Sequence, residues 1–510
     1  MILFNLHTKM VELKKIISHC KEYGFIFPSS EIYDGLAATY DYGPFGVELK
    51  NKIKQSWWKS MVQENENIVG IDTAIFMHPL IWKASGHIDA FNDPLIDNKD
   101  SKKRYRADTL VEDELEKYQQ KINKEIVKAK KRFGSDFDLS TFESTNSRVL
   151  KYKQQINYVT EKLSNALEQE NLEALKTLIE ELEIRCPVSG TINWTDVRKF
   201  NLMFDTKMGA VSNDSNKLFL RPETAQGIFV NFLNVQKSAR KKIPFGIAQI
   251  GKAFRNEIVA RQFIFRMKEF EQMEMQFFVR PGEEMEWYEF WKESRMKWHK
   301  KLNLNCGNYR FHNHQNLAHY ANAACDIEFE FPIGFKELEG IHSRTNYDLS
   351  QHQEFSKKKL SYFDSAINES YIPYVVETSV GLDRLFLSIL CGSFVQEQAD
   401  NEERIVLKLP HYLAPISVAV LPLIKKDGLE EKARTIFTDL KSKFSCHYEA
   451  KDSIGKRYRR QDAIGTPLCI TIDHETISSN TITIRDRDTM KQERVSLDNL
   501  QKIIIEKLDI

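Results

Sequence analysis

The sequence predicts a mixed α and β protein of several domains, with an antiparallel, strand-rich core, a helical insertion and a small C-terminal α/β domain. Three observations predict this fold class. Between residues 186 and 405, aromatic strands such as Ile327–Phe331 alternate cleanly, whereas 111–185 is rich in Glu and Lys and has helical periodicity. After Pro410, strands alternate with helices. A chain of 510 residues also exceeds what one hydrophobic core usually supports.

Composition narrows the class of protein further. An apolar fraction of 42% and a charged fraction of 28% are ordinary for a globular protein, and no apolar run approaches the roughly 20 residues of a membrane span. With a net charge of +1, any nucleic acid would have to be bound by local basic patches. Seven scattered cysteines and a start without a secretory signal pattern predict reduced thiols and a cytoplasmic location, without membrane association.

The first predicted segment, 1–110, contains an amphipathic helix over 45–62 and then a strand that ends near Pro79. Apolar residues of this helix recur every four positions: Phe45, Leu49, Ile53, Trp57 and Met61. From the pattern alone, this stripe is expected to be buried in the chain's own core.

The second segment, 111–185, is expected to form a helical insertion. One of its helical faces is marked by Leu163, Leu167, Leu172, Leu175, Ile179 and Leu182. Two interpretations stay open: a hairpin that projects from the body, and a solvated pair of helices with only a spacing role.

The third segment, 186–405, contains two extended stretches, Gly251–Ile258 and Phe265–Phe278, which are predicted to form an antiparallel pair joined by a polar loop. Alternation places Arg255 and Glu257 on one face of the first strand. On the second strand it gives one face to Phe270, Gln272, Glu274 and Gln276, and the other face to Met273, Met275 and Phe277. An Arg fork grips phosphate and an aromatic ring stacks under a base, so this face predicts a nucleotide site. A plain solvated sheet face is the alternative.

A third element, Val376–Leu385, is predicted to be a strand that bends at Gly381 into an amphipathic helix. Arg384 lies in the first turn, where it opposes the helix macrodipole, so an anion is expected beside it. That anion is either a nearby carboxylate or a bound phosphate. In the extended stretch before this element, Glu337 and Glu339 are expected to share one face and to offer oxygen ligands for Mg²⁺.

These segments resemble the class II aminoacyl-tRNA synthetases, and specifically the glycyl-tRNA synthetase family. The resemblance is carried by Arg221-Pro-Glu-Thr-Ala-Gln-Gly227, by Phe254-Arg-Asn-Glu257, by Glu269-Phe-Glu-Gln-Met-Glu274 and by Val376–Leu385. It covers nearly the whole chain and is weakest over 111–185. The chain departs from many members at Asp383, where they have Gly.

The resemblance implies an ATP site with Mg²⁺. Arg255 would bind the α-phosphate, Glu257 the adenine edge, and Phe270 would stack under the adenine ring. Arg384 would clamp the adenine and reach the γ-phosphate, and Glu337 would hold Mg²⁺; Arg255, Arg384 and Glu337 are thus the expected catalytic residues. The full predicted ATP site is Arg255, Asn256, Glu257, Phe265, Arg266, Phe270, Glu337, Leu338, Gly381, Asp383 and Arg384.

The resemblance also implies a glycine site in which carboxylates and a hydroxyl crowd the ammonium group. The predicted residues are Arg106, Glu223, Phe270, Gln272, Glu274, Glu377, Ser379 and Gly381. A pocket for glycine can exclude every larger amino acid by steric clash, and glycine has no smaller rival, so no editing site is expected. Another interpretation of Glu223 is a first-turn helix residue after Pro222, and both can hold together.

The expected partners are ATP, glycine, the tRNA for glycine and a second copy of the chain, because the family's first motif, matched here over 45–79, builds a homodimer interface. Segment 406–510 resembles an anticodon-binding domain. Its basic stretch 451–460 supplies the predicted tRNA contacts Lys456, Arg457, Arg459 and Arg460, with a solvated basic loop as the alternative.

No structural zinc is predicted. Many family members carry two Cys pairs, but here the corresponding stretches are Asn98–Ser101 and Cys186–Ser189, with a single thiol. His312, His314 and His319 are expected to be core or surface histidines. The predicted function is therefore a glycine–tRNA ligase, against two rivals: a class II synthetase for proline, threonine or histidine, and a non-catalytic accessory subunit.

Overall fold

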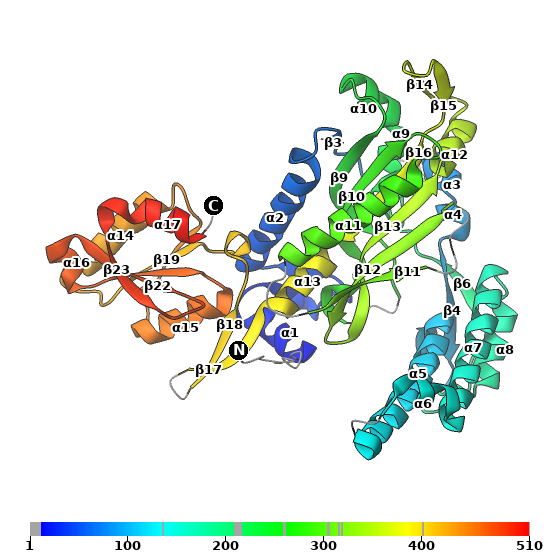
Figure 1. The fold of residues 1–510 in the computed structure, drawn as a ribbon, viewed down its shortest axis with the longest axis horizontal. Coiled ribbons are helices and arrows are strands. Elements are labelled where there is room, and N and C mark those ends of the chain that lie inside the picture. The colour runs from blue at the N-terminus through cyan, green and yellow to red at the C-terminus, as the bar shows by residue number, and fades with distance from the viewer. Residues whose placement is uncertain are drawn as a thin grey trace. The chain divides into compact units, whose positions relative to one another are not determined.

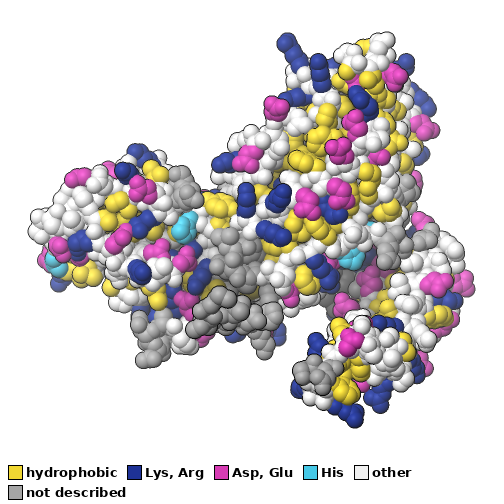
Figure 2. Space-filling model, viewed as in Figure 1, with side chains coloured by type: hydrophobic (Ala, Val, Ile, Leu, Met, Phe, Trp, Pro, Cys, Tyr) yellow, Lys and Arg dark blue, Asp and Glu magenta, His cyan; other side chains and the backbone are white. Residues whose placement is uncertain are grey.

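The computed structural model describes residues 12–134, 137–208, 217–258, 262–302, 307–314, 317, 320–399 and 402–508. It divides into two compact units. Unit 1 comprises Met1–Ser85, Asp205–Arg255 and Arg261–Ile510, and unit 2 comprises Gly86–Phe204 and Asn256–Ala260. Charged side chains of both signs are interspersed over the face shown in Figure 2.

A seven-stranded sheet forms the centre of unit 1 (Figure 1). Across the sheet the strands are β11 (Tyr309–Asn313), β12 (Ala323–Phe331), β13 (Gly334–Thr345), β16 (Tyr374–Gly381), β10 (Glu269–Val279), β9 (Phe245–Phe254) and β3 (Ile68–Gly70). Neighbouring strands are antiparallel except for β3, which runs parallel to β9. The antiparallel sheet predicted from the sequence is confirmed.

Two helices cover one face of this sheet, α11 (Glu284–Leu302) and α13 (Leu382–Ser393). Met273, Met275 and Phe277 of β10 are fully buried in the core beneath them, as the alternation predicted. The opposite face of β10 therefore carries the polar residues, which is the arrangement that a half-buried strand encodes.

Helix α2 (Pro44–Trp58), extended by the wider turn η2 (Lys59–Gln63), matches the predicted amphipathic helix. Leu49, Ile53 and Trp57 are fully buried in the core of unit 1, so this stripe packs within the chain itself. The strand expected to end near Pro79 ends instead at Gly70. Pro79 begins helix α3 because proline's fixed φ suits a first helical position.

The other elements of this part of unit 1 surround the sheet. They are α1 (Leu13–Glu22), β1 (Ile26–Pro28), η1 (Glu31–Tyr33), β2 (Tyr40–Tyr42), α3 (Pro79–Ala84), β7 (Asp205–Lys207), β8 (Lys217–Phe219), α9 (Ala225–Val230), α10 (Phe232–Ser238), η5 (Phe263–Phe265), α12 (Tyr347–Ser356), β14 (Tyr362–Asp364), β15 (Glu369–Tyr371), β17 (Phe394–Ala399), β18 (Glu402–Leu407) and η6 (His411–Leu413).

The C-terminal part of the chain folds around a mixed five-stranded sheet with the order β20-β19-β21-β22-β23. Its elements are β19 (Val418–Pro422), α14 (Leu429–Leu440), β20 (Cys446–Tyr448), α15 (Ile454–Ile464), β21 (Leu468–Ile472), α16 (His474–Ser479), β22 (Thr481–Asp486), β23 (Gln492–Ser496), η7 (Leu497–Asn499) and α17 (Leu500–Leu508). The predicted alternation of strands and helices is present, and the sheet encloses its own apolar cluster with α14 and α17.

Unit 2 combines helices with a three-stranded sheet of order β5-β4-β6. Its elements are α4 (His87–Ala90), β4 (Asn92–Asn98), β5 (Lys103–Arg106), α5 (Ala107–Phe133), α6 (Leu139–Thr145), α7 (Ser147–Glu168), α8 (Leu172–Glu181) and β6 (Arg198–Asn201). The stripe expected from Leu163 to Leu182 is divided between α7 and α8. Asn171 caps α8 by accepting a hydrogen bond from the Ala174 amide at 2.9 Å.

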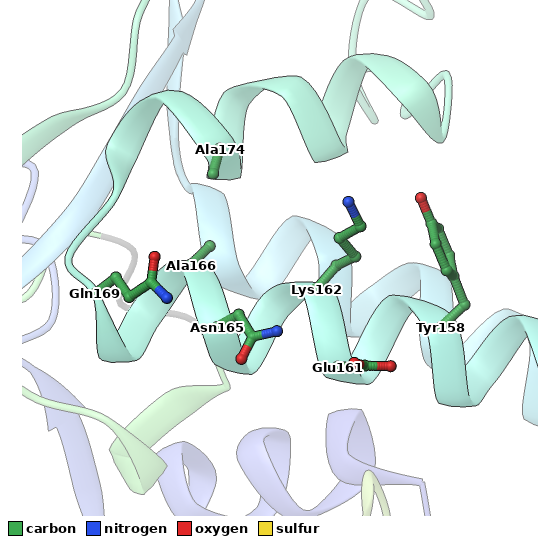
Figure 3. Close-up of a pocket in the computed structure, with 7 residues that line it drawn as sticks. All are labelled: Tyr158, Glu161, Lys162, Asn165, Ala166, Gln169 and Ala174. Carbon is green, nitrogen blue, oxygen red and sulfur yellow. The ribbon is translucent and has the colours of Figure 1, made fainter.

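An open groove of about 510 Å³ runs between α7 and α8 (Figure 3). It is lined by Tyr158, Glu161, Lys162, Asn165, Ala166, Gln169 and Ala174. None of the predicted site residues lies in this groove. Among the described residues, no helix combines the length and the apolar character that crossing a membrane requires.

Candidate active site

The polar face of the central sheet brings most of the predicted glycine-site residues together. In the strand register, Glu274 lies opposite Ser379 on β16 and opposite Gln249 on β9, while Gln276 lies opposite Glu377. Directly paired residues of antiparallel strands project from the same face, so these side chains share one surface.

Glu274 is at the centre of this surface and is almost completely buried. Its carboxylate accepts hydrogen bonds from the Ser379 hydroxyl at 2.7 Å, from the Gln272 amide at 3.1 Å and from the Thr224 hydroxyl. Burial, followed by the charges of Glu377 and Glu223, raises the pKa of Glu274 to about 7. With this pKa, about half of the Glu274 carboxyl groups carry a proton at pH 7 in the absence of a cation.

Glu377 has the opposite environment. Burial alone would raise its pKa, but the Arg344 guanidinium and a hydrogen bond from His342 lower it to about 2. The His342 Nδ1 is 3.0 Å from the Glu377 carboxylate, and the Gln276 amide donates to it at 2.6 Å. Glu377 thus provides a permanent negative charge beside Glu274.

Arg344 is itself held in a buried network. It donates two hydrogen bonds to Asp348 at 2.8 and 3.0 Å, and Asp348 also accepts from Gln226 at 3.2 Å. Gln226 donates to Glu223 at 2.9 Å as well, so Glu223 is connected to this network. Helix α9 begins at Ala225, which corrects the interpretation of Glu223 as a first-turn helix residue.

Three buried amide atoms on this surface have no hydrogen-bond partner among the described residues: Gln249 Nε2, Gln272 Oε1 and Gln276 Oε1. Buried polar atoms in folded proteins are normally paired, so such a group indicates a missing polar ligand. One of these atoms is a donor and two are acceptors, which suits a small molecule with both a carboxylate and an ammonium group.

Arg255 lies at the edge of this surface. Its guanidinium carbon is 5.3 Å from the centre of the Phe270 ring, and its Nε donates to the Pro222 carbonyl at 3.1 Å. The strand expected to include Arg255 and Glu257 ends at Phe254, however, and β10 begins only at Glu269. The connection is longer than predicted because it folds into the turn η5, which buries Phe265 and its neighbour Ile264.

The other predicted residues of this connection are divided between the units. Asn256 and Glu257 belong to unit 2. There the backbone N–H of Asn256 donates to the Leu202 carbonyl at 2.7 Å, and Glu257 is largely buried. Arg266 follows η5 and is half-buried in unit 1.

Arg384 is placed as the sequence predicted, in the first turn of α13 directly after the bend at Gly381. Its guanidinium donates to the Glu337 carboxylate at 2.8 Å, and it lies over the Phe265 ring with its central carbon 4.6 Å from the ring centre. Glu337 is therefore the carboxylate that compensates Arg384, and the Arg384 charge is the main cause of a lowered Glu337 pKa. The phosphates of an incoming nucleotide would compete with Glu337 for the Arg384 guanidinium.

The expectation that Glu337 and Glu339 share a face is wrong. Ile327 pairs with Glu339 and Glu328 pairs with Glu337, so the residue between the two glutamates, Leu338, is an extra residue in β13. This β-bulge shifts the alternation, and the two carboxylates point to opposite faces. Leu338 itself is buried in the core.

Asp383 was predicted to bind ATP, but its carboxylate has other partners in this structure. It is buried and accepts hydrogen bonds from the Glu271 amide at 2.8 Å, from Lys50 at 3.2 Å and from the Tyr42 hydroxyl. These contacts fasten the start of α13 to β10 and α2.

Arg106 lies in unit 2, at the end of β5. It forms ion pairs with Asp93 at 3.0 Å and with Asp108 at 2.6 Å. Burial opposes its charge, but these two carboxylates raise the Arg106 pKa above its usual range. The guanidinium is thus rigidly oriented within unit 2.

The donor set beside Arg384 fits Mg²⁺. Glu337 offers a carboxylate on the polar face, and Asp326 is near enough for the Glu337 charge, after burial, to raise the Asp326 pKa. Oxygen ligands suit Mg²⁺, which usually takes one or two carboxylates together with substrate phosphates and water. The described residues contain no group of three or more His, Cys, Asp or Glu that could hold a metal alone.

The two stretches considered for zinc meet in unit 2 through hydrogen bonds. Asn98 accepts from the Ser101 amide at 2.9 Å and from the Ser189 hydroxyl at 3.0 Å, while the Cys186 sulfur is 3.3 Å from both Ser101 Oγ and Tyr105 OH. Burial alone would raise the Cys186 pKa, but these donors lower it to about 6. Of the three histidines, His314 contacts Asp326 at 2.8 Å and His312 contacts Glu328 at 3.5 Å near the surface, and His319 lies outside the described residues.

The four predicted tRNA contacts lie on helix α15, not on a loop. Lys456 is exposed, and Arg459 and Arg460 are half-buried. Arg457 is fully buried and donates to the carbonyls of Pro422, Leu423 and Glu449, so its guanidinium is not available to a phosphate.

Sequence reasoning missed several residues of the polar face, namely Thr224, Gln226, Gln249, His342, Arg344 and Asp348. An Arg and an Asp four positions apart at 344 and 348 could have signalled an ion pair. Gln249 gave no signal, because an isolated amide in an apolar strand becomes informative only when its neighbours across the sheet are known.

Comparisons with protein families match three consecutive parts of the chain. Residues 93–202 match the glycyl-tRNA synthetase insertion domain 1, residues 204–392 match the class II core domain of tRNA synthetases (G, H, P, S and T), and residues 417–507 match an anticodon-binding domain. The glycine–tRNA ligase of Chlorobaculum tepidum is 48% identical, with 97% of this chain and 100% of the relative covered. That of Staphylococcus haemolyticus is 47% identical, with 98% and 99% covered.

Among solved structures, a prolyl-tRNA synthetase of Giardia lamblia in complex with prolyl-adenylate superposes with a TM-score of 0.59, over 98% of this chain and 80% of that one, at 15% identity. At this identity the likeness shows a shared fold alone. The full-length relatives at 47–48% identity and the family matches show more: the chain belongs to the glycyl-tRNA synthetase family of the class II aminoacyl-tRNA synthetases.

Proposed function

We propose that the chain is a glycine–tRNA ligase. It activates glycine with ATP to glycyl-adenylate and pyrophosphate, and then transfers the glycyl group to the 3′-terminal adenosine of the tRNA for glycine. The observation that carries this function is the polar face of the sheet, where Glu274 accepts hydrogen bonds from Ser379 and Thr224 between two further carboxylates. Such a buried anionic cluster suits an ammonium group.

Glycine is selected by lack of space as well as by charge. The ammonium group would be bound by Glu274, Glu223 and Glu377, and the unpaired Gln249 amide would serve the carboxylate. Gln272 is flanked by Gly251 on one neighbouring strand and Gly381 on the other, and the Arg221 guanidinium occupies the space above Gly251, where an added Cβ would clash with its Nη2. A side chain on the substrate would meet the surrounding buried residues, and no smaller amino acid competes.

In the first step, a carboxylate oxygen of glycine attacks the α-phosphorus of ATP. The bond from that phosphorus to the bridging oxygen breaks, and pyrophosphate leaves with the electron pair. Arg255 and Arg384 would neutralise the phosphates, with Phe270 under the adenine ring. Bound Mg²⁺, held by Glu337 and the phosphates, would supply further charge neutralisation. Positioning and electrostatics are enough, so no side-chain nucleophile is required.

The remaining assignments support the second step and the assembly. Exposed Lys456 on α15, with Arg459 and Arg460 beside it, would contact the tRNA backbone. A homodimer and a cytoplasmic location fit an enzyme of translation, and Arg106 stays a proposed glycine-binding residue. The dimer would use surfaces other than the buried stripe of α2.

The test is amino-acid-dependent exchange of pyrophosphate into ATP, with glycine compared against alanine, serine, proline and threonine. Exchange with glycine alone is expected. Arg255→Ala should lower the glycine-dependent rate by about 100-fold or more, the size found for loss of one donor to a developing charge. The exposed Arg434→Ala on α14 is the matched control and should leave the rate unchanged.

Each failure has a distinct meaning. A folded wild-type protein that exchanges with none of the five amino acids would overturn the ligase function, and exchange with another amino acid would overturn the glycine site. Near-normal exchange by Arg255→Ala would refute the role of Arg255 only.

A further inference from the structure

A buried ionic cluster lies on the side of the sheet opposite to the polar face. The polar face carries the proposed glycine site and is called the substrate face below. The Glu339 carboxylate of β13 accepts a hydrogen bond from Arg295 Nε at 2.7 Å, and its other oxygen is 2.5 Å from His299 Nε2. All three side chains are at most 1% exposed. Arg295 and His299 are one helical turn apart on α11, so they meet β13 from the same face of that helix.

Burying this cluster in the core costs free energy. Removing ions from water costs several kcal/mol for each ion, and apolar residues of the same volume often stabilise a protein as well or better. Stability alone therefore does not explain the cluster. Fixing one register among several is the best-attested use of a buried ionic group.

The register that this cluster could fix is the β-bulge at Leu338. Without an extra residue, alternation would place Glu337 and Glu339 on one face of β13. With it, Glu339 turns to the α11 side while Glu337 turns to the substrate face, 2.8 Å from Arg384. Both oxygens of Glu339 are engaged inside the core, so of these two glutamates Glu337 is the one available to a nucleotide or a cation.

We propose that Arg295 and His299 act as positioning residues: they hold Glu339 against α11, fix the bulge at Leu338 and thereby present Glu337 to the Mg²⁺–nucleotide. This inference rests on the proposed function and deepens it, because it names the groups that place the one carboxylate expected to hold Mg²⁺. Arg295, His299 and Glu339 are buried together on the α11 side of the sheet, away from the proposed substrate site.

The first experiment uses the full chain with Glu339→Gln, which keeps the volume and removes the charge. Binding of a non-hydrolysable ATP analogue, measured by calorimetry with and without Mg²⁺, should weaken by about 10- to 100-fold in Mg²⁺, the size typical for groups that orient a metal ligand. Binding without Mg²⁺ and the KM for glycine should change by less than about twofold, because the glycine site lies on other residues.

The second experiment tests whether Glu339 acts through Glu337. If it does, the double variant Glu337→Gln/Glu339→Gln binds the Mg²⁺–analogue no more weakly than Glu337→Gln alone, whereas independent effects would add. The matched control is Glu330→Gln on the neighbouring strand, whose carboxylate accepts from Asn308 at the surface and should be neutral. His299→Gln repeats the test from the α11 side if Glu339→Gln does not fold.

The positioning role would be overturned if the affinity losses of Glu337→Gln and Glu339→Gln added in the double variant. It would also be overturned if Glu339→Gln and His299→Gln both folded and bound the Mg²⁺–analogue as the wild-type protein does. Equal loss of nucleotide affinity with and without Mg²⁺ would also overturn it, since that result indicates general damage to the site. Failure of the proposed function is seen separately, as absence of glycine-dependent exchange by the wild-type protein.

Discussion

At the scale of single residues, the candidate glycine site contains two neighbouring carboxyl groups with opposite pKa shifts. Glu377 is kept ionised by Arg344 and His342, with a pKa of about 2. Glu274 has a pKa near 7 because it is buried beside Glu377 and Glu223. Two carboxyl groups whose environments separate their pKa values have different roles. Here Glu274 is the group whose proton an incoming ammonium group would displace.

Glycine binding should therefore depend on pH. Below pH 7 the raised pKa keeps Glu274 protonated and neutral, so its attraction for an ammonium group appears only as pH rises. The KM for glycine should fall between pH 6 and pH 8, by at most about tenfold per pH unit. Glycine-dependent pyrophosphate exchange at saturating Mg²⁺–ATP measures this.

Glu274→Gln should raise the KM for glycine about 30-fold or more, the cost of removing one partner of a buried charge pair. It should also flatten most of the pH dependence, leaving the contribution of His342, whose pKa is raised by Glu377 against the effect of burial. An unchanged pH profile in Glu274→Gln would show that another group titrates in this range.

At the scale of elements, helix α15 combines two functions on neighbouring residues. Arg457 points into the domain and satisfies three backbone carbonyls near the ends of β19 and β20, whereas Lys456 is exposed. A helix presents adjacent residues to different sides, so one short basic run supplies both a buried clamp and a surface charge.

Two substitutions on α15 should separate these functions. Lys456→Ala should weaken tRNA binding and reduce the slope of log affinity against log salt by about 1, with no loss of stability. Arg457→Ala should lower the free energy of unfolding by about 1–3 kcal/mol, because buried carbonyls lose their donor. Binding titrations at several salt concentrations and denaturant unfolding measure the two effects. A reversed pattern would contradict this division.

At the scale of the whole molecule, unit 2 has an apolar core of its own. Val111 and Ile179 are fully buried and Leu175 nearly so, all within unit 2. Hydrogen bonds among Asn98, Ser101, Cys186 and Ser189 join the turn at 99–102 to the turn at 187–189 within unit 2. A lone thiol with amide and hydroxyl neighbours is a poor zinc site, which needs about four N or S ligands.

Unit 2 should therefore fold without metal. A fragment of residues 86–204 is expected to show helical circular dichroism and one cooperative melting transition, unchanged by EDTA. Purified full-length protein should contain no stoichiometric zinc by elemental analysis. Zinc in the protein, or a melting temperature lowered by chelation, would contradict the prediction. A fragment that does not fold would show that unit 2 needs the rest of the chain.

The sequence pattern was sufficient to predict those features whose physical cause lies within a few neighbouring residues. Periodicity of apolar residues determined α2 and the bend from β16 into α13, and alternation determined which residues of β10 lie on the polar face and which lie in the core. The motif strings determined the family. In each case the signal lies within one turn of helix or a few residues of strand, so it can be read without knowing the neighbours.

Tertiary structure alone decided the features that depend on distant partners. The bulge at Leu338 appears only in the pairing of β13 with β12, where Glu328 pairs with Glu337 and Ile327 pairs with Glu339. The start of β10 at Glu269 depends on the burial of Phe265, and the inward turn of Arg457 depends on carbonyls of other elements. Alternation and charge specify what a residue offers, but the side it faces is settled by the free energy of contacts far along the chain.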